Sequence, residues 1–105
     1  MPVIEMLRVI HVGRDRHVLG IAEYPGEAMR VVLPLRTIIA EALRLGSSGL
    51  LLSHNHPSGD PTPSPADISA TQQLARAARA LDIRLVDHII SGDGSSVSFR
   101  ALGLI

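Results

Sequence analysis

The chain has 105 residues, which is enough for one domain with a single hydrophobic core and too few for two. Its ten basic and ten acidic residues cancel, so it lacks the overall positive charge typical of a non-specific nucleic-acid binder. It contains no cysteine, which excludes disulfides, thiolate nucleophiles and cysteine-ligated zinc. Any metal would have to be held by histidine and carboxylate side chains.

The first residues, MPVIEMLRVI, lack both the charged start and the small-residue cleavage site of a signal peptide. No apolar run approaches the ~18 residues that a membrane-spanning helix needs. We therefore expect a cytoplasmic protein with no membrane contact, folded as one domain over residues 1–105.

The first half of the chain predicts three strands and a helix. MLRVIHV (6–12) and VLGIAEY (18–24) flank a polar turn and form a hairpin, and MRVVL (29–33) is a third strand. After Pro34, apolar residues recur at helical spacing until Gly46, which is typical of a residue that closes a helix.

The second half predicts a buried strand at GLLLSH (49–54) and a helix that begins at Pro65. IRLVDHIIS (83–91) and SVSF (96–99) follow as strands on either side of a GDG turn. The order βββαβαββ predicts an α/β domain with a mixed β-sheet flanked by two main helices.

Two histidines separated by one residue follow the buried strand. Residues i and i+2 of a strand point to the same side, so His54 and His56 converge on one ion if the chain stays extended. Pro57 favours this, because the residue before a proline is pushed toward the β region. Asn55 is expected to face the other way.

A catalytic zinc site commonly has three protein ligands and keeps one position for water. Asp67 lies in the first turn of the following helix, and the proline-rich loop before it would bring its carboxylate back to the two imidazoles. SPAD is also a good helix start, with Ser64 as N-cap and Asp67 answering it from the third helical position. The two interpretations are compatible.

The pattern H-x-H-P followed by S-x-x-D resembles the motif of the JAMM (MPN-plus, JAB-domain) metalloproteases, and its residues here are His54, His56, Pro57, Ser64 and Asp67. The longer string HNHPSGDPTPSPAD, with LVDHIISGDG downstream, resembles more narrowly the RadC family of bacterial JAB-domain proteins. The similarity is strong from Pro34 onward and weaker before it.

The resemblance implies a Zn²⁺ ion held by His54, His56 and Asp67, and a glutamate outside the motif as general base. RadC-like domains carry an acidic residue just before their first strand, where this chain has Glu5, while Glu23 is the alternative base. The reaction implied is hydrolysis of an amide bond in a peptide or isopeptide substrate of unknown identity.

The resemblance also implies that Ser64 donates a hydrogen bond to the developing oxyanion. Downstream, Asp87 and His88 are neighbours in a strand, so only one of them faces the site. We expect a structural hydrogen-bonding role for Asp87, with a contact to a ligand imidazole as its functional alternative. His11 and His17 are expected to lie on a strand face and in a turn.

Other function classes stay open. RadC-like proteins have been labelled DNA-repair factors, so the chain would alternatively be a nucleic-acid or protein interaction module with a non-catalytic JAB fold, including a homodimer. The zero net charge and the near absence of aromatic residues argue against tight nucleic-acid binding. Nothing resembling the helical N-terminal region of full-length RadC-like proteins precedes the domain, which indicates a truncated or stand-alone variant.

Overall fold

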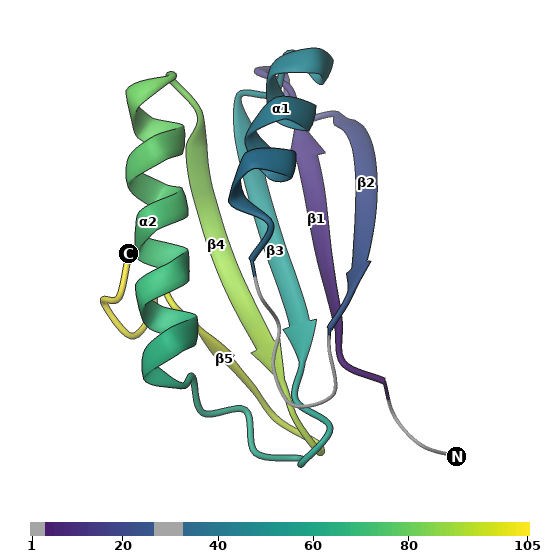
Figure 1. Cartoon of the computed structure of the whole chain (residues 1–105), viewed down its shortest axis with the longest axis vertical. Coiled ribbons are helices and arrows are strands. Elements are labelled where there is room, and N and C mark those ends of the chain that lie inside the picture. The colour runs from purple at the N-terminus through teal and green to yellow at the C-terminus, as the bar shows by residue number, and fades with distance from the viewer. Residues whose placement is uncertain (1–3, 27–32) are drawn as a thin grey trace.

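The computed structural model describes residues 4–26 and 33–105 (Figure 1). The elements, in chain order, are β1 (Met6–Val12), β2 (Val18–Pro25), α1 (Leu35–Leu45), β3 (Gly49–Asn55), α2 (Pro65–Ala80), β4 (Arg84–Ser91) and β5 (Ser96–Ser98). The predicted α/β class with a mixed sheet and two helices is confirmed. The strand expected at 29–33 lies outside the described residues, except for its last position.

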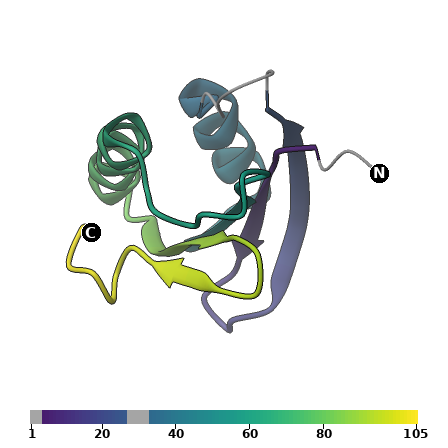
Figure 2. The same ribbon diagram turned by 90° about the horizontal axis from the view of Figure 1, so that it is seen from below.

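The five strands form one sheet in the order β2-β1-β3-β4-β5. All neighbours are antiparallel except β3 and β4, which α2 connects as a parallel crossover. Figure 2 shows both helices on the same face of this sheet. The carboxyl ends of β3 and β4 therefore meet at one edge, together with the start of β1 and the loop that leads into α2 (Figure 1).

The core lies between the helices and this face of the sheet. Alternate residues of β1 and β3, among them Val9, Leu50 and Leu52, are fully buried there. Ile38 of α1 and Leu74 of α2 pack onto them. Within residues 4–26 and 33–105, no helix is both long enough and apolar enough to cross a bilayer.

Strand β4 carries a β-bulge that changes which of its side chains face the helices. Leu50 pairs with Leu85, but the next residue, Leu51, pairs with Asp87, so β4 has one extra residue at this point. Strict alternation from the buried Leu85 would turn His88 to the far side of the sheet. Because of the extra residue, His88 points toward the helices and is buried.

The side chain of Arg100 holds the bulge. Its guanidinium donates to the carbonyl oxygens of Leu85 and Val86, both at 2.7 Å. The carboxylate of Asp87, the next residue, accepts hydrogen bonds from the Ser98 hydroxyl and the Arg100 backbone amide. These hydrogen bonds occupy the carbonyl groups of two of the bulge residues and the carboxylate of a third.

Candidate metal centre

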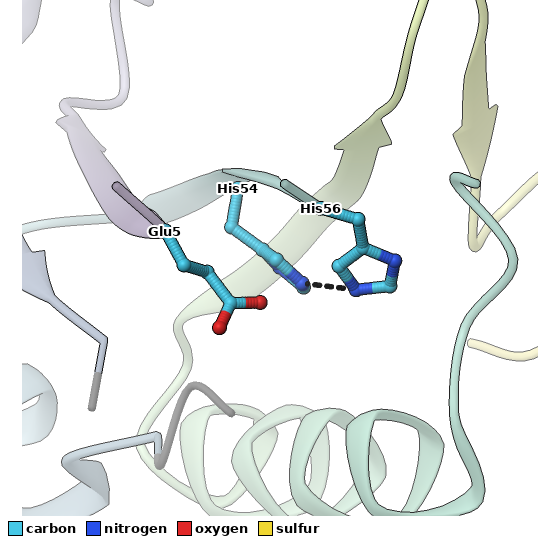
Figure 3. A group of neighbouring side chains, drawn as sticks. All are labelled: Glu5, His54 and His56. Carbon is cyan, nitrogen blue, oxygen red and sulfur yellow. Dashed lines mark hydrogen bonds between the residues drawn. The ribbon is translucent and has the colours of Figure 1, made fainter. Parts of the chain in front are cut away.

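The two motif histidines leave the end of β3 on the helix side of the sheet. His54 continues the buried row of Leu50 and Leu52. His56 follows the last residue of β3, and its backbone amide donates to the Ser91 carbonyl of β4 at 2.8 Å, so the pairing with β4 reaches as far as this residue. The two Nε2 atoms lie 3.0 Å apart, as the dashed line in Figure 3 marks.

The tautomer of His56 follows from its other ring nitrogen. Nδ1 lies 2.8 Å from the carbonyl oxygen of Asp60, which only accepts hydrogen bonds. Nδ1 therefore carries the proton, and in the neutral ring Nε2 presents its lone pair toward His54. A lone pair aimed at a second ring nitrogen requires a proton or a cation between the two atoms.

Asp67 forms the predicted capping box and also reaches the histidines. Its amide donates to Ser64 Oγ at 3.0 Å, and its Oδ2 accepts from the Ser64 amide at 2.9 Å. The same Oδ2 lies 3.3 Å from His56 Nε2. Capping the helix therefore aims this carboxylate at the imidazole, so the structural and the metal-binding interpretations describe one conformation.

Two of the donor–donor distances are close to those that a tetrahedral ion requires. Zn–N and Zn–O bonds of 2.0–2.2 Å at tetrahedral angles separate neighbouring donors by about 3.3–3.6 Å. The distance between the histidine Nε2 atoms is 3.0 Å, and that from His56 to Asp67 is 3.3 Å. Two imidazoles and one carboxylate also suit zinc chemically, so the residues fit the ion.

Glu5 lies at the same site, just before β1. Its carboxylate, His54 and His56 each offer one ligand atom, and these atoms lie within 4.8 Å of one another. Figure 3 shows the carboxylate reaching the space beside the His54 ring. Within residues 4–26 and 33–105, these three side chains form the group whose possible ligand atoms all lie close to one another. Asp67 is outside this group but lies next to one of its members, His56.

The side chain of Asn55, a residue to which the sequence pattern assigned no function, positions Glu5. It faces away from the histidines as expected, and there it accepts from the Met6 amide at 2.8 Å and donates to the Ile4 carbonyl at 3.0 Å. These bonds hold the residues on both sides of Glu5. The residue between the two motif histidines therefore attaches the segment that carries Glu5 to the same strand end.

Burial perturbs the charges of this site. It lowers the pKa of His54 to about 4, against the opposing attraction of Asp67, so that His54 is neutral at physiological pH. It also raises the pKa of Glu5, against the opposing effect of His56. A neutral imidazole is the form that binds a metal, and a carboxylate with a raised pKa is suited to accept and release a proton.

The other glutamates lie elsewhere. Glu23 forms an exposed ion pair with Arg8 at 3.0 Å, and Arg8 alternates with the buried residues of β1, so this pair is on the far face of the sheet. Glu41 pairs with Arg44 on the surface of α1. Glu27 lies outside the described residues.

The turn after β4 supports the loop that carries His56. The amide of Asp93 donates to the Gly59 carbonyl at 2.8 Å. The two segments are so close that a Cβ on Gly92 would come 2.3 Å from that same oxygen. This contact gives a physical reason for glycine in the downstream ISGDG string.

Behind His54 lie two polar residues that the sequence analysis did not assign to the site. His88 Nε2 is 2.6 Å from His54 Nδ1, and Thr71 Oγ1 is 2.8 Å from His88 Nδ1. The ring of Phe99 stacks on His88 at a centroid distance of 4.5 Å. The contact to a ligand imidazole, which was considered for Asp87, is made by its neighbour because of the bulge.

Comparison with known proteins gives a consistent result. Residues 2–104 match the profile of the family described as RadC-like JAB domain. A UPF0758 protein of Rhodobacter capsulatus is 44% identical over 102 residues, which cover 96% of this chain and 48% of that protein. A UPF0758 protein of Roseiflexus castenholzii is 43% identical over 101 residues, covering 95% of this chain and 43% of that protein. The chain thus spans less than half the length of these relatives.

Proposed function

The chain belongs to the RadC-like JAB domain family, and we propose that it is a zinc-dependent hydrolase that cleaves amide or isopeptide bonds in a peptide substrate. The observation that carries the proposal is the convergence of two imidazoles and two carboxylates at one edge of the sheet. His54, His56 and Asp67 hold the ion, and Glu5 is the proton acceptor.

When bound, the ion lowers the pKa of a water molecule toward ~7 and polarises the substrate carbonyl. The two carboxylates have different roles, metal binding and proton transfer, according to how each side chain is held. Asp67 is fixed by its capping bonds beside His56, which suits a ligand. Glu5 has a raised pKa, and the hydrogen bonds that hold its segment are made to the backbone of residues 4–6, which suits a carboxylate that gains and loses a proton.

Glu5 accepts the proton of the attacking water at its carboxylate and then donates it to the nitrogen of the leaving amine. General acid–base transfer of this kind contributes about 10²–10⁴-fold to a rate. A scaffold that keeps only the fold would not require a glutamate within 4.8 Å of the two histidines, so this placement favours catalysis over the non-catalytic alternative.

Ser64 donates a hydrogen bond to the oxyanion. Its oxygen accepts the Asp67 amide as helix cap, which uses a lone pair and leaves the hydroxyl hydrogen available. One oxyanion donor is worth about 2.7–4 kcal/mol of transition-state stabilisation where its geometry is good. Capping and catalysis therefore use different atoms of the same hydroxyl group.

The test is hydrolysis by zinc-loaded protein of two quenched fluorescent libraries, one of linear peptides and one of lysine-linked isopeptides. In heavy-oxygen water, products cleaved by this site gain one heavy oxygen in the new carboxylate, and a zinc chelator abolishes their formation. Glu5→Gln serves as the matched control, because it keeps the shape of the side chain and removes the base. Equal cleavage by this variant would refute the mechanism.

A further inference from the structure

Three buried side chains form a line of hydrogen bonds that runs from the core to the candidate metal centre. Thr71 of α2 contacts His88 of β4 at 2.8 Å, and His88 contacts His54 of β3 at 2.6 Å. All three are at most 2% exposed. The line ends at His54 Nε2, the atom that faces His56.

Each neutral imidazole has one protonated nitrogen and one lone pair, so the direction of one bond in the line determines the others. If His88 donates from Nδ1 to Thr71, its Nε2 accepts from His54 Nδ1, and His54 Nε2 is left with a lone pair. If the direction is reversed, His54 Nε2 carries the proton and cannot bind a metal. The threonine hydroxyl serves as acceptor in the first case and as donor in the second.

We propose that Thr71 and His88 are positioning residues that hold the proton of His54 on Nδ1 and so direct its Nε2 lone pair into the metal centre. This inference rests on the proposed metal site. A ligand histidine commonly donates its second N–H to a carbonyl, a carboxylate or water. Here a second histidine, His88, accepts that hydrogen bond and in turn donates its own N–H to the Thr71 hydroxyl in the core.

Two features of the structure orient His88 for these hydrogen bonds, and packing of the core alone does not require either of them. The bulge in β4 turns His88 toward the helices, where strict alternation would have placed it on the far face. Phe99 then stacks on the ring with an interplanar angle of 16°, which restricts its rotation. The ring is thus held with one nitrogen toward Thr71 and the other toward His54.

The experiment measures zinc affinity at fixed pH by chelator competition, on the folded whole chain. Thr71→Val keeps the shape of the side chain and removes the hydroxyl, and Thr71→Ser restores it. His88→Leu removes both nitrogens, whereas His88→Gln offers an oxygen to His54 Nδ1 and an amide N–H to Thr71. We expect Thr71→Val and His88→Leu to weaken zinc binding about 10- to 100-fold, and Thr71→Ser and His88→Gln to recover most of it.

Nitrogen-15 spectroscopy of the histidine rings gives a second measurement that a packing role would not change. In the zinc-bound protein we expect His88 to be protonated on Nδ1 and unprotonated on Nε2. The opposite tautomer, or zinc affinities of Thr71→Val and His88→Leu equal to that of the wild type, would overturn the inference while leaving the metal site intact. A wild-type protein that does not bind zinc would overturn the inference and the proposed function together.

Discussion

Replacing Asp67 with alanine separates its role as a helix cap from its proposed role as a metal ligand. The capping box consists of two bonds, one from the Asp67 amide to Ser64 Oγ and one from the Ser64 amide to Asp67 Oδ2. Asp67→Ala removes the second bond and keeps the first. Ser64→Ala does the reverse, so the two variants each lose one capping bond.

Both variants should lose similar stability in the metal-free state. Loss of an N-cap interaction costs about 1 kcal/mol, which in a domain of this size lowers the melting temperature by roughly 4–8 °C. Only Asp67→Ala also loses the proposed ligand oxygen, Oδ2, which lies 3.3 Å from His56 Nε2. We expect its zinc affinity to fall by more than the roughly 100-fold that can follow loss of an outer-shell contact, while Ser64→Ala binds nearly as the wild type does.

The assays are thermal unfolding with a chelator present and zinc titration against a chromophoric chelator. Glu5→Gln is the third arm, because Glu5 rather than Asp67 belongs to the group of mutually close ligand atoms. If Asp67→Ala binds zinc as tightly as Ser64→Ala and Glu5→Gln does not bind it, the reasoning is refuted. The two carboxylates would then exchange roles, and Asp67 would be a cap alone.

Further predictions concern the base, its support, the loop contact and pH. Glu5→Gln should keep stoichiometric zinc and lose about 10²–10⁴-fold in the rate of hydrolysis. Asn55→Ala should also keep zinc but lose less of the hydrolysis rate, because the Asn55 side chain holds the residues on both sides of Glu5. Gly92→Ala should displace the loop and weaken zinc binding, since its Cβ would lie 2.3 Å from the Gly59 oxygen, and unchanged affinity would contradict this. Burial lowers the pKa of His88 from 6.5 to about 3, so the metal-free protein should be most stable above pH 6.5 and lose stability below it. This residue alone accounts for about 2 kcal/mol between pH 7 and pH 5, and a flat urea-unfolding profile would exclude that effect.

Local patterns predicted the elements of this fold because each obeys a rule that operates within a few residues. The first strand has the expected bounds, Met6–Val12, and the second helix begins at Pro65 as predicted. Gly46 ends α1 with a φ of 67°, a conformation that glycine adopts without strain. Ser64 and Asp67 form both bonds of the capping box that their spacing indicated.

The support of the site was not predictable in the same way, because it depends on pairing between distant segments. Asn55 acts on residues 49 to 51 positions away in the sequence. Thr71 shares the buried face of α2 with Leu74 and Ala78, so helical spacing alone predicts a core position, although its hydroxyl hydrogen-bonds to His88. His88 could not be assigned to a face without the bulge, since one extra residue reverses the alternation on which such an assignment depends.

The positions of these contacts bear on how the site would bind a metal. Both candidate ligand imidazoles are held by the ring nitrogen that faces away from the site, His56 Nδ1 by the Asp60 carbonyl and His54 Nδ1 by His88. The Asp67 carboxylate is held by the Ser64 amide, which donates to the same Oδ2 that lies 3.3 Å from His56 Nε2. Side chains fixed in this way lose little conformational freedom when an ion binds, so more of the coordination energy remains as affinity. Hydrogen bonding thus sets the orientation of these side chains before an ion binds.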